Sequence, residues 1–206
     1  MDYAFFLGCV MPTRELGLEV SGRKVLEAFG VKLHEMDGAS CCGSTNPIAS
    51  LDFLTMAAMN ARNISIAEEM GMDIITFCTG CAGVLAKYNS LLKQDKHLRE
   101  QVNEILKDLD KEFKGTIEVK HSMDVLVNDI GMEKIKSAIK KKFNGLRVAA
   151  HIGCHAVRPS EIRKFDSPER PIILDQLIEL TGAQSINYLG KNLCCGAGLI
   201  GVSDDV

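Results

Sequence analysis

The same order of residues occurs twice along this chain, and the repeat constrains the fold more than any other feature of the sequence. In the first copy, an apolar strand ends at Cys9, a helical segment ends at Gly30, and a short strand over 31–36 leads to Cys41-Cys42-Gly43. Alternating strands and helices are typical of parallel strands joined by crossover helices. We therefore expect an α/β fold with cysteines at the strand ends.

The second copy repeats these elements in the last third of the sequence. A strand over 148–154 ends at Cys154, a helix over 172–181 stops at Gly182, and a strand over 185–189 leads to Cys194-Cys195-Gly196. We expect two pseudo-symmetric repeats, 1–145 and 146–206, each a small, mainly parallel sheet with flanking helices and with cysteines on loops.

The first copy also contains elements that the second lacks. Ser50 is expected to cap a helix whose apolar residues Leu51, Leu54, Ala58, Ala61 and Ile64 recur every three or four positions, and Gly71 ends it. A buried strand over 73–77 then delivers Cys78-Thr79-Gly80-Cys81 to the start of another helix. Beyond it we expect charged helix over 93–115, a strand near 117–120, a helix capped by Ser122 and a solvated, lysine-rich helix face over 136–142.

The chain has eight cysteines, which are distributed according to this repeat. Its N-terminus does not have the pattern of a secretory signal, so we expect metal or redox chemistry rather than disulfides. The spacing is C-x31-CC-x35-CxxC in the first copy and C-x39-CC in the second. Thiols on loops rich in glycine suit iron–sulfur ligation, because glycine lets the backbone approach a bulky cluster. The two sets are Cys9, Cys41, Cys42, Cys78 and Cys81, and then Cys154, Cys194 and Cys195.

Other uses of these thiols stay open. A structural zinc site usually has paired C-x-x-C segments, and each copy here has an adjacent cysteine pair instead. A redox dithiol would use Cys78 and Cys81 alone, and buried cysteines with no cofactor would act as small hydrophobic residues. Covalent haem attachment is excluded, because Ala82 and not histidine follows Cys81.

Charge and hydropathy exclude two classes of partner. The formal net charge is -3 and the pI is about 6.0, so the chain offers no basic face to a nucleic acid. Its longest apolar stretches are shorter than the roughly 18 residues that a membrane-spanning helix needs, so we expect no membrane segment.

The spacing of the first five cysteines resembles that of the cysteine-rich CCG domain family. Its duplicated form occurs in the B-type subunit of the coenzyme B–coenzyme M heterodisulfide reductase of methanogenic archaea, and the resemblance covers essentially the whole chain. It implies that Cys9, Cys41, Cys42, Cys78 and Cys81 bind one noncubane [4Fe-4S] cluster, and that Cys154, Cys194 and Cys195 bind part of a second.

The resemblance also implies a reaction and partners. The reaction is reduction of the mixed disulfide of coenzymes M and B to two thiols, with one electron from each cluster. The partners are the A-type subunit, which carries FAD and iron–sulfur clusters, and the C-type subunit, which carries iron–sulfur clusters, joined to a hydrogenase or formate dehydrogenase in the cytoplasm. One alternative is a subunit of a related redox enzyme with this domain, such as thiol–fumarate reductase, glycolate or lactate oxidase, or a succinate dehydrogenase anchor. Another alternative is a noncatalytic electron-transfer or assembly module.

Three further residues are candidates for roles near the substrate. His155 directly follows Cys154 and is either a proton donor to the product thiolates or a hydrogen-bond donor to the cluster. Arg14 and Arg158 follow the first cysteine of each copy and are candidates for binding a sulfonate or phosphate. We expect His34, His97 and His121 at strand edges or on the surface.

The second copy departs from the pattern at its end. The repeat predicts another C-x-x-C about 35 residues after Cys195, beyond Val206. We expect a truncated second repeat. The alternative is a second site that has three cysteines and either is completed by another chain or carries no cluster.

Overall fold

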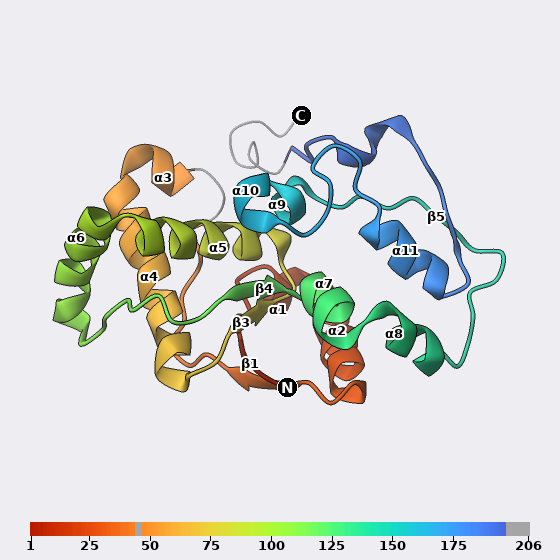
Figure 1. Ribbon diagram of the computed structural model, residues 1–206, viewed down its shortest axis with the longest axis horizontal. Helices are drawn as coiled ribbons and strands as arrows, with labels where there is room; N and C mark the ends of the chain where they lie inside the picture. Colours follow the sequence, from red (N-terminus) through yellow and green to blue (C-terminus); the bar gives the residue numbers. More distant parts are fainter. Residues whose placement is uncertain (44–46, 197–206) are drawn as a thin grey trace. The chain divides into compact units, whose positions relative to one another are not determined.

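The computed structural model describes residues 1–43 and 47–196, which form two compact units, one covering Met1–Ser122 and one beginning at Met123. Figure 1 labels the α-helices and most of the strands. In chain order, those of the first unit are β1 (Asp2–Phe5), α1 (Met11–Arg14), α2 (Leu16–Ala28), β2 (Lys32–Glu35), α3 (Pro47–Leu51), α4 (Phe53–Met70), β3 (Ile74–Thr76), α5 (Thr79–Gln94), α6 (Lys96–Leu106), η1 (Lys107–Leu109) and β4 (Val119–His121).

The first unit is built on a parallel sheet of four strands in the order β2-β1-β3-β4. Ala4 on β1 pairs with His34 on β2 and with Ile74 on β3, and Ile74 pairs with Val119 on β4. Every residue of β3 is buried, as expected for an inner parallel strand that is covered on both faces. The predicted α/β fold, with a parallel sheet and flanking helices, is confirmed.

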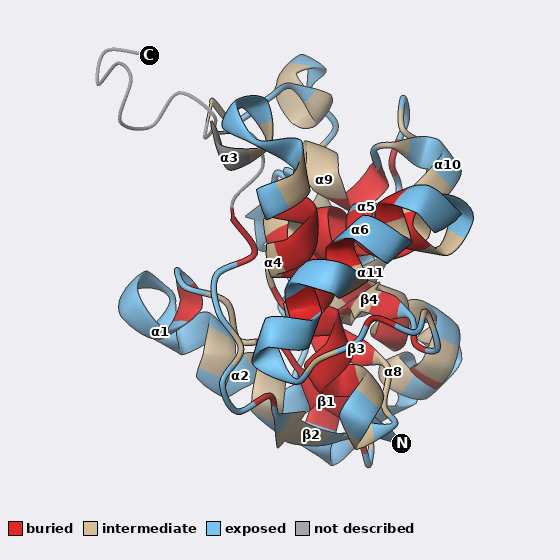
Figure 2. Ribbon diagram, turned by 90° about the vertical axis from the view of Figure 1, so that its left-hand side faces the viewer, coloured by how far each residue is buried: buried red, intermediate tan, exposed pale blue. Residues whose placement is uncertain are grey.

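Helices α4 and α5 supply much of the core of this unit. Figure 2 shows buried residues concentrated in β1, β3, α4 and α5. On α5 the predicted inward residues Val84, Leu85, Tyr88 and Leu92 are all buried. The helical period read from the sequence is therefore correct for this helix.

The start of α4 differs from the prediction. Asp52, not Ser50, caps the helix, because its carboxylate accepts hydrogen bonds from the backbone N–H groups of Leu54 and Thr55 at 3.0 and 3.1 Å. Leu51 therefore lies before this helix and is 88% exposed instead of buried. The predicted end is correct, since Gly71 adopts the left-handed conformation that follows many helices.

A glycine brings α2 close to the end of β3. A Cβ atom on Gly22 would lie 2.6 Å from the ring of Phe77, so only glycine lets the helix approach this ring. Phe77 in turn packs against Phe5, with 4.9 Å between the ring centroids. This packing fixes the backbone immediately before Cys78.

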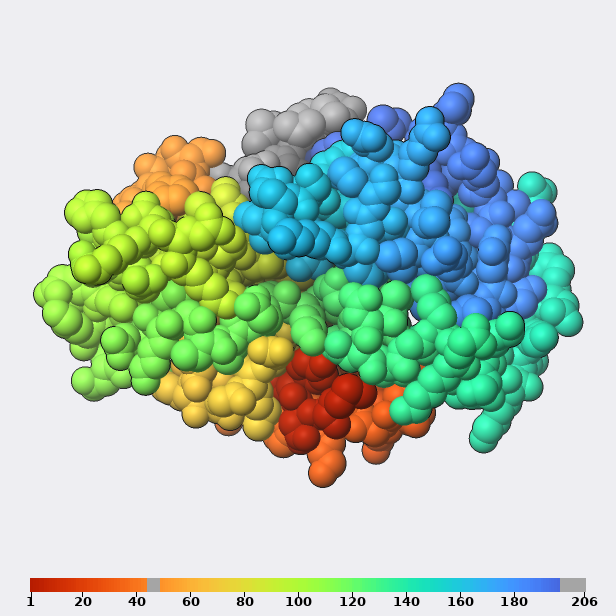
Figure 3. Space-filling view, in the orientation of Figure 1, coloured from red at the N-terminus to blue at the C-terminus, as the bar shows by residue number. Residues whose placement is uncertain are grey.

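The charged segment over 93–115 is helical in part, as predicted. Leu98, Val102 and Leu106 form the buried side of α6, and the rest of this helix is polar apart from the exposed Ile105. Figure 3 shows α5 and α6 in yellow-green on the surface of the first unit. The predicted strand near 117–120 is present as β4.

The second unit contains shorter elements than the sequence predicts. Its two-stranded parallel sheet pairs Arg147 with Gln184 and Val148 with Ser185, so only the first residue of the predicted strand over 148–154 is paired. The hydroxyl of Tyr188 donates a hydrogen bond to the carbonyl oxygen of Ala150 at 3.0 Å. The elements are α7 (Ser122–Asp124), the π-helix η2 (Val125–Ile130), α8 (Met132–Ala138), β5 (Arg147–Val148), α9 (Cys154–Val157), α10 (Ser160–Arg163), α11 (Ile173–Leu180), β6 (Gln184–Ser185) and η3 (Leu189–Asn192).

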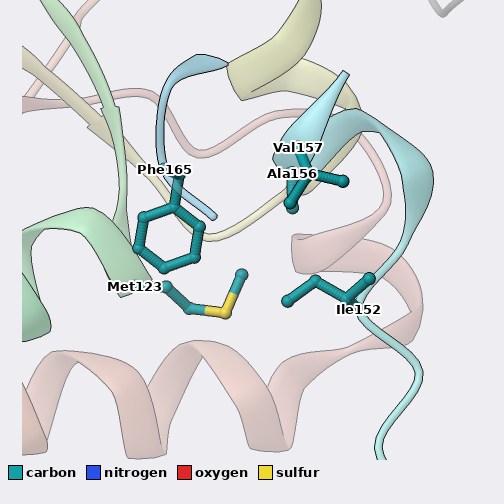
Figure 4. Packing of buried hydrophobic residues seen from close by; sticks show 5 residues of the cluster. All are labelled: Met123, Ile152, Ala156, Val157 and Phe165. Atoms are coloured by element: carbon teal, nitrogen blue, oxygen red, sulfur yellow. The ribbon is translucent and has the colours of Figure 1, made fainter. Parts of the chain in front are cut away.

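A small apolar cluster forms the core of the second unit. Figure 4 shows Met123, Ile152 and Phe165 converging near Ala156 and Val157, and all five are buried. Beside this cluster, the guanidinium of Arg163 donates a hydrogen bond to the carboxylate of Asp124 at 3.0 Å. Residues shortly after 122 thus pack with the second unit, while the repeat boundary between 145 and 146 stays a prediction.

In the described part of the chain, no helix is both long enough and apolar enough to cross a bilayer.

Candidate functional site

The loops that follow three neighbouring strands carry the first five cysteines. Cys9 follows β1, Cys41 and Cys42 follow β2, and Cys78 and Cys81 follow β3. Because these strands are parallel, their carboxyl ends lie at one edge of the sheet, where loops commonly form binding sites. The strand order therefore brings together thiols that are far apart in the sequence.

The thiols meet in pairs. The sulfur atoms of Cys9 and Cys41 are 3.9 Å apart, and those of Cys42 and Cys81 are 3.5 Å apart. The sulfur of Cys78 accepts a hydrogen bond from the backbone N–H of Cys81 at 3.5 Å, which makes Cys78 the cap of α5. The five predicted residues of the first set therefore form two groups, Cys9 with Cys41 and Cys42 with Cys81 and Cys78, which the adjacent residues Cys41 and Cys42 connect along the chain.

The second pair is more enclosed than the first. Cys42 and Cys81 are buried, whereas Cys9 and Cys41 are exposed. A cavity of about 320 Å³ opens beside Cys9 and Cys41 and is also lined by Phe6, Met36 and Asp37. The group therefore has one side in the protein interior and one side toward solvent.

The start of α5 favours a negative charge on one of these sulfurs. Hydrogen bonds from the Cys81 thiol and from the backbone N–H groups of Cys81 and Gly80 lower the pKa of Cys78 to about 6. Contact with Cys42 and Cys78, together with burial, raises the pKa of Cys81. Burial and the neighbouring Cys41 also raise the pKa of Cys9. Of Cys9, Cys78 and Cys81, only Cys78 has a lowered pKa.

Gly8 lies directly against this group. Its φ angle is +74°, which only glycine adopts freely, and a Cβ atom there would lie 3.2 Å from the sulfur of Cys81. Within the described residues no three histidine, cysteine or acidic side chains surround a single ion-sized point. Five thiols at one edge of the sheet, with backbone close at Gly8, fit the soft ligand set of an iron–sulfur cluster.

The structure does not join the second cysteine set in this way. Cys154 is the half-buried first residue of α9, and Cys194 and Cys195 are exposed after η3. In the described ranges, no hydrogen bond joins any two of these three thiols. Their role as ligands stays a prediction, and the predicted later C-x-x-C lies outside the sequence.

The remaining predicted residues are placed as follows. His155 is half-buried on α9, and burial lowers its pKa. Arg14 is exposed at the end of α1, and Arg158 is exposed and donates a hydrogen bond to the carbonyl oxygen of Pro168 at 2.7 Å. None of these placements tests the proposed roles.

The three histidines expected at strand edges or on the surface differ in how far their side chains are exposed. His34 is half-buried on the edge strand β2 and bonds Asp2 at 2.9 Å, and His97 is exposed. His121 lies on the other edge strand but is only 6% exposed, because its Nε2 atom bonds the carbonyl oxygen of Phe77 at 2.9 Å. His121 is therefore at a strand edge, as expected, with its side chain turned away from solvent.

Asn60 and Asn63 are residues of this site that the sequence analysis missed. Both are on α4, both are fully buried, and both donate hydrogen bonds to the backbone of the loop that carries Cys41 and Cys42. Two asparagines among the apolar residues on the inward face of α4 were the available signal, because a buried amide requires partners.

Comparison with known proteins identifies related chains. The cysteine-rich domain family, CCG, matches residues 3–86 and 148–205. The B-type subunit of the ferredoxin/F(420)H(2)-dependent CoB-CoM heterodisulfide reductase of Methanosarcina acetivorans is 41% identical over 95% of this chain and 65% of that protein. A protein of Archaeoglobus profundus, named as similar to the B-type subunit of heterodisulfide reductase, is 35% identical over 99% of this chain and 69% of that protein.

Two other similarities are more distant. The 8-methylmenaquinol:fumarate reductase membrane anchor subunit of Wolinella succinogenes is 32% identical over 95% of this chain and 67% of that protein. A crystal structure of a hypothetical protein from Helicobacter pylori shares the fold, with a TM-score of 0.65 and 14% identity over 93% of this chain and 34% of that one.

This chain spans about 65% of the length of the first of these relatives. The family match covers both copies of the repeat and includes all eight cysteines. The chain therefore belongs to the cysteine-rich CCG domain family and is similar over most of its length to the B-type subunit of heterodisulfide reductase.

Proposed function

We propose that the first cysteine set binds an iron–sulfur cluster and that the chain is the cluster-carrying part of an oxidoreductase that reduces a disulfide. The observation that carries this proposal is the meeting of five thiols from three loops at one edge of the sheet, with sulfur pairs 3.9 and 3.5 Å apart. Such a cluster would supply electrons one at a time.

The proposal extends to the kind and number of clusters. A fifth thiolate exceeds the four ligands of an ordinary cubane, which supports the noncubane [4Fe-4S] type. We place a second cluster, incomplete within this chain, at Cys154, Cys194 and Cys195. Their match to the second copy of the CCG family supports this assignment.

The proposed substrate is the mixed disulfide of coenzymes M and B. The relatives with 41% and 39% identity, both from Methanosarcina species, are named as B-type subunits of CoB-CoM heterodisulfide reductases, which supports this choice. Cleavage of the S–S bond takes two electrons and two protons and releases two thiols. The electrons come from partner subunits, and the protons must come from residues or water near the substrate.

The chain's own residues have separate tasks in this scheme. Cys78, whose pKa is lowered at the start of α5, provides a ready thiolate for the metal. His155 is the proposed proton donor. Because burial lowers its pKa, its protonated form is a stronger acid than a free imidazolium, and a smaller fraction carries the proton at neutral pH. Arg14 and Arg158 are the proposed partners of the anionic groups of the coenzymes.

Partners and location follow from the same proposal. We propose the FAD-bearing A-type subunit and the iron–sulfur C-type subunit of heterodisulfide reductase as partners, with a hydrogenase or formate dehydrogenase as the electron source, in the cytoplasm. The naming of similar chains as B-type subunits supports membership of such a complex.

A second candidate is a quinol-linked role. The 32% identity to the membrane anchor of 8-methylmenaquinol:fumarate reductase favours it. In that case the cluster would pass electrons between a quinol and a partner protein, and no disulfide would be reduced.

The rate at which the reconstituted protein oxidises reduced viologen, measured with a disulfide or a quinone as the electron acceptor, decides between the two candidate functions. We expect oxidation with the coenzyme M–coenzyme B disulfide and none with a water-soluble quinone, and we expect His155→Ala to lower turnover. Oxidation of the viologen with the quinone but not with the disulfide would refute the disulfide reductase proposal and favour the quinol-linked role. Turnover that is unchanged in His155→Ala would remove His155 from the mechanism.

A further inference from the structure

Helix α4 binds the backbone of the loop over 38–42 through three side chains. Arg62 donates to the carbonyl oxygen of Gly38 at 2.8 Å. Asn63 accepts from the backbone N–H of Ser40 at 2.9 Å and donates to its carbonyl oxygen at 3.2 Å. Asn60 donates to the carbonyl oxygen of Cys42 at 3.1 Å. The shape of this loop is therefore set largely by α4.

This loop determines where two of the thiols lie. Cys41 and Cys42 are adjacent, yet the sulfur of Cys41 is near that of exposed Cys9, and the sulfur of Cys42 is near that of buried Cys81. A rotation of the backbone here would move both sulfurs at once. The hydrogen bonds of Asn60 and Asn63 lie on both sides of Cys41 and oppose that rotation.

The two asparagines are also costly to bury. Asparagine is a weak helix former, and a buried amide without partners is destabilising. Both side chains are 0% exposed, and the Oδ1 atom of Asn60 has no hydrogen-bond partner among the described residues. Stability of α4 alone does not account for these residues, whereas their bonds to the loop do.

We propose that Asn60 and Asn63 are positioning residues that hold Cys41 and Cys42 apart, one thiol toward solvent and one toward the interior, ready to bind a cluster. This inference rests on the proposed function for the role of the cluster. The hydrogen bonds between α4 and the loop are made by protein atoms alone, so the arrangement of the loop is tested in the metal-free protein.

The test is site-resolved alkylation of the metal-free, reduced full chain with iodoacetamide, followed by mass spectrometry. We expect Asn63→Ala to raise the alkylation rate of buried Cys42 by about tenfold or more, because at least two hydrogen bonds are lost. Asn60→Ala should raise it less. Asn63→Asp, which keeps the acceptor for Ser40 N–H and loses both N–H donors, should fall between wild type and Asn63→Ala.

Asn89→Ala is the matched control. Asn89 is also a buried helical asparagine, and it donates to a backbone carbonyl oxygen, that of Ile117, at 3.0 Å. It should lower global stability while leaving the alkylation rate of Cys42 at the wild-type value. An equal increase in Asn89→Ala, or a wild-type rate in both Asn63→Ala and Asn60→Ala, would overturn the proposal.

Anaerobic reconstitution with iron and sulfide then tests the link to the cluster. Asn63→Ala should lose bound iron about tenfold faster than wild type and Asn89→Ala. Loss at the wild-type rate would overturn the positioning role toward the cluster. A wild-type chain that takes up no iron would refute the proposed function, and the alkylation rates would still decide whether the asparagines hold the loop.

Discussion

Alanine at Gly8 should damage the cysteine site more than an alanine that causes the same loss of stability elsewhere. The φ angle of Gly8 is +74°, so a side chain there adds strain of roughly 1 to 2 kcal/mol. Its Cβ would also lie 3.2 Å from the sulfur of Cys81, and that sulfur is held at the buried start of α5. Either the backbone or the sulfur must move by a few tenths of an ångström.

Gly30 provides the matched control. Its φ angle is +76°, and a Cβ there would meet no atom within 4 Å. Gly30→Ala therefore carries about the same backbone strain without the contact to Cys81. The difference between the two variants isolates the contact.

The assay combines urea unfolding of the metal-free protein with iron retention after anaerobic reconstitution. We expect both variants to lose about 1 kcal/mol of unfolding free energy, and Gly8→Ala alone to lose iron about tenfold faster. Equal iron retention by Gly8→Ala and Gly30→Ala would refute the reasoning that glycine is needed beside Cys81.

Other predictions concern packing and charge. Gly22→Ala should lower the unfolding free energy by about 1 to 3 kcal/mol relative to Gly17→Ala, because only at Gly22 does a Cβ meet the Phe77 ring; equal stabilities would contradict this. Arg163→Ala should destabilise by about 3 kcal/mol because it removes one partner of the buried ion pair between Arg163 and Asp124, as a urea titration would show; an unchanged unfolding free energy would contradict this. Burial raises the pKa of Asp175, but hydrogen bonds from Lys191 and Ser185 outweigh burial and hold the pKa below its usual value. The stability that the ionised Asp175 contributes is present above about pH 4 and is lost as the pH falls through the lowered folded-state pKa. The unfolding free energy, measured against pH, should therefore fall less steeply in this range in Asp175→Asn than in wild type.

Sequence patterns predicted the elements whose signal is local and strong. The apolar run of β3 and the helical period of α5 placed Cys78 and Cys81 at a strand-to-helix junction, where the structure has them. Parallel strands then required the other loops to meet them at the same edge. The grouping of the first five cysteines could therefore be predicted in outline from spacing and strand order.

Features that depend on a choice between competing partners could not be predicted from the sequence. Ser50 and Asp52 are both good capping residues, and the choice of Asp52 depends on which residue faces two free N–H groups. The strand before Cys154 is short because its partner β6 has only two residues. The burial of His121 depends on its bond to Phe77, a residue 44 positions away.

The central claim is that Cys9, Cys41, Cys42, Cys78 and Cys81 form one iron–sulfur site, and the iron and sulfide content of the anaerobically reconstituted chain tests it most directly. We predict about four iron and four sulfide per chain held by this set, lost in Cys42→Ser and Cys81→Ser and kept in Cys154→Ser. Bound zinc in place of iron, or an iron content that Cys42→Ser and Cys81→Ser leave unchanged, would contradict the account.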